Sequence, residues 1–140
     1  MTTPRIELTD APTHEDLAEL GGALARFNDS DVGPSEKRNL AVLVRGDDNQ
    51  LLGGLNGYTA WGWLYVQWLW IAEDLRGQGM AGKLLAEAEA EAIARGCHGA
   101  LIDSFSPTAI AVYQRAGYAE FGRLPDFPHG RSRVYLQKAL

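Results

Sequence analysis

Residues 68–95 read WLWIAEDLRGQGMAGKLLAEAEAEAIAR. The apolar run that ends at Ile71 predicts a strand, residues 76–82 form a glycine-rich turn, and the Ala/Glu/Leu segment that follows has the periodicity of a helix. In a strand–turn–helix unit of this kind, several backbone N–H groups point toward the positive end of the helix dipole. The stretch therefore predicts a site for an anion, usually a phosphate, and makes this turn the candidate centre of the chemistry.

Two well-known phosphate motifs match the turn only in part. Gly77, Gly79 and Gly82 spell G-x-G-x-x-G, and Asp103 lies near the position of a ribose-binding acid. A dinucleotide fold needs further strand–helix units, however, and the chain of 140 residues contains one clear crossover unit. The turn also matches G-x-x-x-x-G-K, but Leu84 follows where a nucleotide triphosphatase needs Ser or Thr to hold magnesium. The first match is weak and the second fails.

A third motif includes the arginine of the turn. Arg76-x-x-Gly79-x-Ala81, between a strand and a long helix, resembles the Gln/Arg-x-x-Gly-x-Gly/Ala loop with which the GNAT superfamily of N-acetyltransferases binds the pyrophosphate of coenzyme A. Residues 109–118, AIAVYQRAGY, resemble the second recurring segment of that family, a short helix ending in Tyr-x-x-x-Gly-aromatic. The two motifs stand in the right order within residues 64–120, and the N-terminal third carries no comparable letters.

Periodicity and turn residues predict the order of the elements. A first helix is capped by Thr13 and runs to about Arg26, where a polar loop over residues 28–34 begins. A long helix follows the glycine-rich turn and ends at Gly96, and a short helix begins after the cap residue Ser106. Expected strands cover residues 5–8, 40–44, 51–60, 64–72, 100–103, 118–124 and 133–137.

These elements predict one α/β domain over residues 1–140. Strands 51–60 and 64–72 should form an antiparallel hairpin, whereas the helical crossover makes strands 64–72 and 100–103 parallel. The resemblance implies a GNAT-like fold, that is, a central mixed, mostly antiparallel sheet with a splayed parallel strand pair, flanked by helices.

Side-chain spacing also predicts faces. The buried stripe of the first helix should consist of Leu17, Leu20, Leu24 and Phe27. Because side chains alternate along a strand, one face of strand 64–72 should carry Trp68 and Trp70. The other face should carry Tyr65, Gln67, Leu69 and Ile71.

The resemblance implies which residues hold acetyl-CoA. In the family, the strand before the turn offers backbone groups to the pantetheine arm, and the amides of the turn bind the pyrophosphate. Arg76 would flank the pyrophosphate, Lys83 would be available for charge pairing, and Ser106 stands where many relatives have an asparagine that touches the cofactor. The expected contacts are Leu69, Trp70, Ile71, Arg76, Gly77, Gln78, Gly79, Met80, Ala81, Gly82, Lys83 and Ser106.

Tyr113 occupies the recurring tyrosine of the family, which commonly donates a proton to the departing sulfur. A phenol has an unperturbed pKa of about 10, so it is protonated at neutral pH and able to donate. The resemblance therefore implies that Tyr113 is the general acid. The alternative is that Tyr113 fills the inward face of the short helix and hydrogen-bonds the cofactor.

The sequence does not identify the general base. Some family members carry a glutamate on the strand before the turn, but the aligned residue is Tyr65. Asp103 acting through a water, His129 and a chain of ordered waters are the alternatives. Candidates for the acceptor side are Asp29, Asp31, Trp61, Trp63 and His129.

Composition limits partners and compartment. The formal net charge of −5 and the pI near 5.1 argue against a nucleic-acid partner and fit a cationic or neutral amine. Cys97 is the sole cysteine, so no internal disulfide can form and a reducing, cytoplasmic location is expected; a nucleophilic Cys97 beside His98 is the sharper alternative. No signal peptide is recognisable, and the most apolar stretch, residues 61–72, is too short to span a bilayer, so no membrane partner is expected.

The predicted function is transfer of an acetyl group from acetyl-CoA to a primary amine of a small molecule or peptide, by direct attack and without a metal. One rival is a non-catalytic acyl-CoA-binding or regulatory module, and another is a dinucleotide oxidoreductase. The aromatic hairpin and the resemblance also suggest a homodimer. The sequence motifs do not specify which amine is the acceptor or whether the protein also transfers acyl groups other than acetyl.

Overall fold

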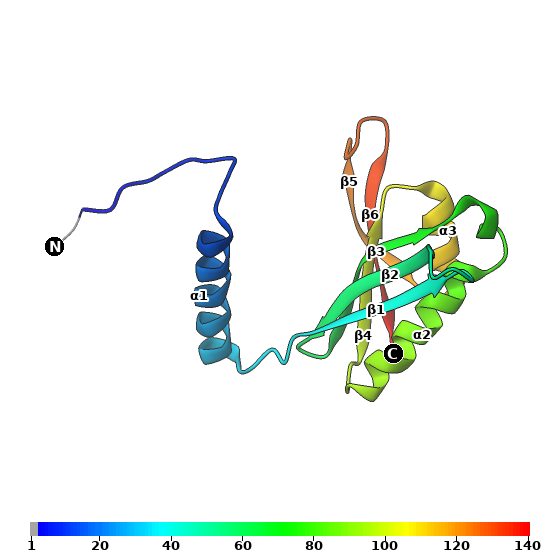
Figure 1. The fold of residues 1–140 in the computed structure, drawn as a ribbon, viewed down its shortest axis with the longest axis horizontal. Helices are drawn as coiled ribbons and strands as arrows, with labels where there is room; N and C mark the ends of the chain where they lie inside the picture. The colour runs from blue at the N-terminus through cyan, green and yellow to red at the C-terminus, as the bar shows by residue number, and fades with distance from the viewer. Residues whose placement is uncertain (1–2) are drawn as a thin grey trace. The chain divides into compact units, whose positions relative to one another are not determined.

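The computed structural model describes residues 3–140 of the chain. These residues belong to two compact units, which divide between Ser35 and Glu36. The N-terminal unit contains one helix and the C-terminal unit contains the sheet (Figure 1).

The helix of the N-terminal unit, α1 (His14–Val32), begins as predicted, because the Thr13 hydroxyl accepts a hydrogen bond from the Asp16 amide at 3.0 Å. The predicted end is wrong, since the helix continues through the expected loop to Val32. Its polar residues bond locally and allow the extra turn: the Ser30 hydroxyl donates to the Phe27 carbonyl at 2.8 Å. The strand expected over residues 5–8 is also wrong, because that segment pairs with no strand.

No residue of α1 is buried. The side chains of the predicted stripe are between 52% and 70% exposed, so the expectation that they are buried is wrong; they are Leu17, Leu20, Leu24 and Phe27. A single helix offers no second layer against which an apolar stripe can pack. The N-terminal unit therefore presents an apolar surface.

The C-terminal unit is built on a six-stranded sheet with the order β1-β2-β3-β4-β6-β5. Every neighbouring pair is antiparallel except β3 and β4, which are parallel. The strands are β1 (Arg38–Arg45), β2 (Leu51–Ala60), β3 (Trp63–Ile71), β4 (Gly99–Ser104), β5 (Ala119–Pro125) and β6 (Ser132–Ala139). The mixed, mostly antiparallel sheet expected from the sequence is confirmed.

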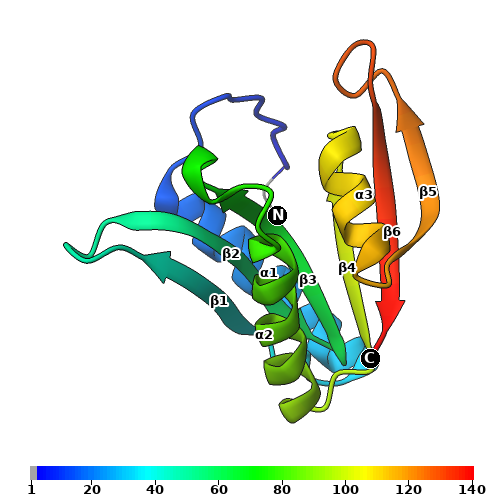
Figure 2. The same cartoon turned by 90° about the vertical axis from the view of Figure 1, so that its right-hand side faces the viewer.

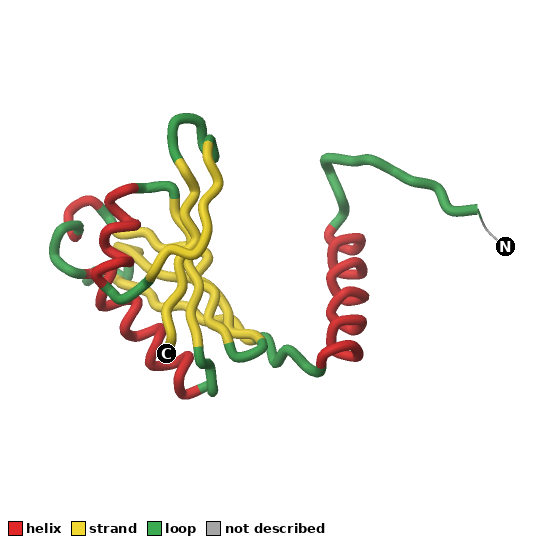
Figure 3. Tube along the Cα trace, turned by 180° about the vertical axis from the view of Figure 1, so that it is seen from behind, coloured by secondary structure: helices red, strands yellow, loops and turns green. Residues whose placement is uncertain are grey.

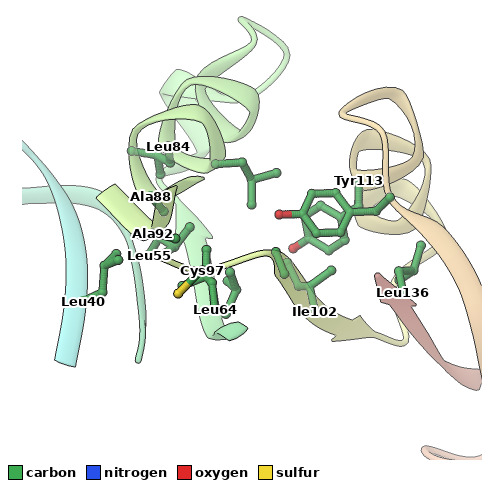
Figure 4. Close-up of a cluster of buried hydrophobic side chains, with 14 of the residues drawn as sticks. Leu40, Leu55, Leu64, Leu84, Ala88, Ala92, Cys97, Ile102, Tyr113 and Leu136 are labelled. Carbon is green, nitrogen blue, oxygen red and sulfur yellow. The ribbon is translucent and has the colours of Figure 1, made fainter. Parts of the chain in front are cut away.

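Two helices lie on the same face of this sheet, α2 (Met80–Ala94) and α3 (Pro107–Arg115) (Figures 2 and 3). The buried stripe of α2 is set by its sequence periodicity and includes Leu84, Leu85, Ala88 and Ala92. Figure 4 shows several of these residues together with Leu64, Ile102 and Tyr113. The core of this unit therefore lies between the sheet and the two helices.

A β-bulge interrupts β3. Asn56 pairs with Trp68, but the next residue of β2, Gly57, pairs with Val66, so Gln67 is the extra residue. Gly57 is required because a Cβ at this position would overlap the Tyr65 carbonyl oxygen.

The bulge changes which residues share a face. Before it, Leu64 and Val66 are buried in the core, and after it Leu69 and Ile71 pack against that core. Tyr65 therefore lies on the opposite face, with its ring centroid 5.7 Å from that of Tyr58. The prediction that Tyr65 shares a face with Leu69 and Ile71 is wrong, because an extra residue reverses the alternation.

The parallel pair separates halfway along β3. Residues Trp63–Val66 pair with Gly99–Ile102, and the pairing stops there. The predicted splay is confirmed, and it leaves the second half of β3 without a neighbour on the β4 side.

Within residues 3–140, no helix is both long and apolar enough to cross a membrane.

Candidate functional site

The glycine-rich turn joins β3 to α2 through a short 3-10 helix, Glu73–Leu75. Gly77 and Gly79 adopt φ angles of 74° and 75°, the left-handed conformation that glycine takes without strain. Gly79 is the N-cap of α2, and no side chain caps this helix end. Because the first amides of a helix have no intrahelical acceptor, this end has unsatisfied N–H donors that suit an anion.

Two side chains of the turn stabilise it by bonding to backbone oxygens. The Arg76 Nε donates to the Ile71 carbonyl at 2.8 Å, and the Gln78 amide nitrogen donates to the Asp74 carbonyl at 2.9 Å. Arg76 thus fixes the end of β3 to the turn. The Ile71 carbonyl, expected to face pantetheine, already accepts this bond.

The turn opens onto two cavities. One has a volume of about 540 Å³ and lies between the turn and α3, and the other has a volume of about 380 Å³ and extends toward Tyr113. They adjoin, since both are lined by Ile71, Arg76, Ala81, Thr108 and Val112. Together they form a continuous cleft from the open end of α2 to the phenol.

Most of the expected contact residues line this cleft. Those that do are Leu69, Ile71, Arg76, Gly77, Gly79, Met80, Ala81, Gly82 and Ser106, and the predicted acid Tyr113 lines the cleft as well. Trp70, Gln78 and Lys83 line neither cavity. Sequence reasoning missed Thr108, Val112 and Arg115 on α3, although their spacing of four and three residues places them on one helix face. Arg115 adds a cation to a cavity already suited to an anion.

Tyr113 is 5% exposed. Burial, and then the negative charge of Asp103, raise its pKa to about 12. The phenol is therefore protonated at neutral pH, as predicted. Its ring packs edge-on against Tyr118, with 6.5 Å between the ring centroids.

Ser106 has a structural role at the start of α3. Its hydroxyl accepts a hydrogen bond from the Ala109 amide at 3.3 Å, and Pro107 follows at the first helical position. The predicted cap is confirmed. Ser106 also lines the cavity next to Tyr113, so its position is compatible with the expected cofactor contact.

Asp103 is joined to two neighbouring strands. The Tyr65 hydroxyl donates to Oδ1 at 3.1 Å, and the Arg133 Nη1 donates to Oδ2 at 3.3 Å. The guanidinium of Arg133 lies 4.0 Å from the ring centroid of Phe127 and 5.2 Å from that of Phe105. This cluster was not predicted as a unit, because it depends on the strand order β4-β6 and on the bulge in β3.

Several other candidates do not join the cleft. Trp63 lies at the start of β3, opposite the end that carries the turn, and packs edge-on against His98 with 5.4 Å between the centroids. His129 is fully exposed, 3.9 Å from Asp126 Oδ1. Trp61, which precedes Trp63, also lines neither cavity.

The candidates Asp29 and Asp31 belong to the last turns of α1, in the N-terminal unit. Asp29 Oδ1 accepts a hydrogen bond from the Ser35 amide at 3.2 Å. This contact joins the end of α1 to the segment that follows it.

Cys97 is buried, and burial raises the pKa of its thiol. A raised pKa disfavours the thiolate that a nucleophile requires. The Cys97–His98 alternative therefore has no support, since His98 packs on Trp63.

Among residues 3–140, no three His, Cys, Asp or Glu side chains are grouped so as to hold a metal ion.

Comparison with known proteins agrees with this geometry. The family model described as the acetyltransferase (GNAT) family matches residues 7–118. Acetyltransferase Atu2258 of Agrobacterium fabrum is 45% identical over 131 residues, which are 94% of this chain and 96% of the relative. Blasticidin-S acetyltransferase of Streptomyces morookaense is 38% identical over 101 residues, 71% of this chain and 74% of the relative.

A solved structure supports the same assignment. A crystal structure of an acetyltransferase from Agrobacterium tumefaciens superimposes with a TM-score of 0.94 at 43% identity, covering 98% of this chain and all of that one. The match includes the sheet whose split strands and adjoining turn form the cleft. The chain therefore belongs to the GNAT family of acetyltransferases.

Proposed function

We propose that the protein transfers the acetyl group of acetyl-CoA directly to a primary amine of a small molecule or peptide. The observation that carries the proposal is the cleft that runs from the uncapped N-terminus of α2 to the buried phenol of Tyr113. Acetyl-CoA supplies an activated acetyl group, which forms an amide with the amine while coenzyme A is released.

The residues of the cleft fit the diphosphate of coenzyme A. The amides at the start of α2 would bind its oxygens, because they have no intrahelical acceptor and lie at the positive end of the helix dipole. Arg76 and Arg115 line the same cavity and would add positive charge. The unpaired half of β3, including Leu69, would lie along the pantetheine arm.

Tyr113 is the residue proposed to assist the departing sulfur as a general acid, and its pKa of about 12 limits this assistance to hydrogen-bond donation. An ordinary thiol has a pKa of about 8.5, so complete transfer of the phenol proton to a thiolate would be unfavourable by about 5 kcal/mol. Tyr113 therefore stabilises the departing sulfur by donating a hydrogen bond. The proton that finally resides on sulfur comes from the amine nitrogen.

The acceptor is proposed to be a small amine. A relative that is 38% identical bears the name blasticidin-S acetyltransferase, and the net charge of −5 favours a cationic acceptor. No metal is part of the proposed reaction.

We also propose that residues 1–140 form a single N-acetyltransferase domain, because the family match spans both compact units. The single cysteine supports a cytoplasmic location.

The test is a panel of amines with thiol release as the readout. It should include polyamines, amino acids, aminoglycosides, lysine peptides and blasticidin S. Turnover of at least one class is expected. A module that only binds acyl-CoA would bind coenzyme A without turnover, and a dinucleotide oxidoreductase would be stabilised by NADH rather than by coenzyme A.

Tyr113→Phe should lower kcat by about 100-fold, within the range for loss of a hydrogen-bond donor that stabilises charge developing in the transition state. Tyr118→Phe is the matched control, because Tyr118 is also a buried tyrosine but its hydroxyl donates to Glu89 Oε2 at 2.9 Å, away from the cleft. Equal kcat losses in both variants would remove the role assigned to Tyr113.

We also propose that the protein is a homodimer. On the sheet face opposite α2 and α3, Trp68 is 72% exposed and Trp70 is 52% exposed, beside an apolar depression of about 340 Å³. Large exposed apolar patches commonly mark protein contacts. Light scattering should give a dimer mass for the wild type and a lower mass for Trp68→Ser, and a monomeric wild type would overturn this proposal.

A further inference from the structure

The position of Asp103 in the sheet singles it out. The pairing of β3 with β4 ends at Val66 and Ile102, so Asp103 is the first residue of β4 beyond the paired segment. Ile102 is buried in the core, and because side chains alternate, Asp103 points to the face opposite α2 and α3. Its side chain is 14% exposed.

The carboxylate of Asp103 is held from two sides but retains free acceptor positions. Tyr65 on β3 donates to Oδ1, and Arg133 on β6 donates to Oδ2. An ionised carboxylate offers about four lone-pair positions, and these two bonds use two of them. Arg133 is in turn fixed by the ring of Phe127, with the guanidinium carbon 4.0 Å from its centroid.

Asp103 also acts on the helix side of the sheet. Its negative charge contributes to the raised pKa of Tyr113 on α3, which lines the cleft. On the opposite face, Tyr58 on β2 and Tyr135 on β6 contribute with Asp103 to the raised pKa of Tyr65, and Tyr135 pairs with Asp103 across the strands. Asp103 is therefore the carboxylate located where the strands separate, between the phenol of the cleft and the opposite face.

We propose that Asp103 binds the ammonium group of the acceptor on the sheet face opposite α2 and α3, and that Tyr65 and Arg133 position its carboxylate. The inference rests on the proposed function and deepens it by naming the recognition element. The amine would enter from the face opposite the cleft and meet the acetyl group at the strand split. Asp103 holds the cation, and one proton leaves the ammonium to water before the nitrogen attacks.

The test compares a charged acceptor with an uncharged one. Asp103→Asn keeps the size of the side chain and an oxygen that accepts from Tyr65, but it removes the charge. The acceptors are the best primary amine among spermidine, a lysine peptide and blasticidin S, and hydroxylamine, which is uncharged at neutral pH. Loss of kcat/KM should be at least about tenfold greater for the ammonium than for hydroxylamine, as expected for a lost bond to a charged group.

Two further variants separate binding from general effects. Glu120→Gln removes one negative charge from an ion pair with Arg123 on an exposed surface, and it should leave the ratio of the two acceptors unchanged. Tyr65→Phe removes one donor to Asp103 and should raise KM for the amine while KM for acetyl-CoA stays within about twofold. This variant also provides the measurement if Asp103→Asn does not fold.

Each result has a defined meaning. A wild type that transfers acetyl to neither acceptor refutes the proposed function itself. A wild type that uses hydroxylamine but no charged amine, or an Asp103→Asn variant with equal losses for both acceptors, overturns the assignment of Asp103. An unchanged KM for the amine in Tyr65→Phe overturns the positioning role of Tyr65.

Discussion

Gly79→Ala tests whether the open end of α2 binds coenzyme A. Gly79 has a φ of 75°, a conformation that costs an alanine about 1–2 kcal/mol. No atom lies within 4 Å of the position that a Cβ would occupy, so the methyl group would clash with nothing in the protein. It would instead project from a residue that lines the 540 Å³ cavity.

The expected effect on binding follows from the bonds at risk. A diphosphate that is displaced by the methyl group loses at least one hydrogen bond between a charged oxygen and a backbone amide, which is worth about 1.5–3 kcal/mol. The dissociation constant for coenzyme A should then rise by about 10- to 150-fold.

Gly96→Ala is the matched control. Gly96 follows the C-terminus of the same helix, has a φ of 88° and also has no atom within 4 Å of a Cβ. Both variants should lose similar free energy of unfolding in urea, whereas calorimetry should show weaker coenzyme A binding in Gly79→Ala alone. Unchanged binding in Gly79→Ala, or an equal loss in Gly96→Ala, would refute the reasoning.

Three further changes test the surrounding structure. Lys138→Met should lower the free energy of unfolding by about 1–3 kcal/mol, because it leaves the Glu89 carboxylate, 2.7 Å from the lysine nitrogen, without its cation; urea denaturation measures this, and an unchanged midpoint would contradict it. Because the pKa of Tyr113 is about 12 when folded and 10.0 in the reference state, the unfolded chain loses this proton first. Stability should therefore fall from pH 10 to 12 by up to about 1.4 kcal/mol per pH unit, and Tyr113→Phe should show a shallower fall than the wild type in the same titration. Ser106→Ala should cost about 1 kcal/mol through loss of the α3 cap while Ser106→Asn retains it, which thermal melting can compare.

The parts of the fold that were predicted correctly are those in which local backbone demands select particular residues. Gly77 and Gly79 mark the turn because they adopt positive φ angles, and Ser106 marks the start of α3 because its hydroxyl caps that helix. The contact between Asp103 and Arg133 has no such local signal, because it joins residues 30 positions apart through the order of the strands. The bulge at Gln67 was missed for a related reason: the glycine that permits it, Gly57, lies on the neighbouring strand.

This bulge connects the two halves of the proposed site. Without the extra residue, side-chain alternation would place Tyr65 on the same face as Leu69, and one strand could serve only one side of the sheet. With it, β3 presents Tyr65 to the face where Asp103 lies and then Leu69 to the cleft that contains Tyr113. The pairing with β4 ends next to the same bulge, so the strand changes face where the sheet opens. In the proposed reaction, donor and acceptor would approach from opposite faces and meet where the strands separate, which would hold the reacting groups close together for direct transfer.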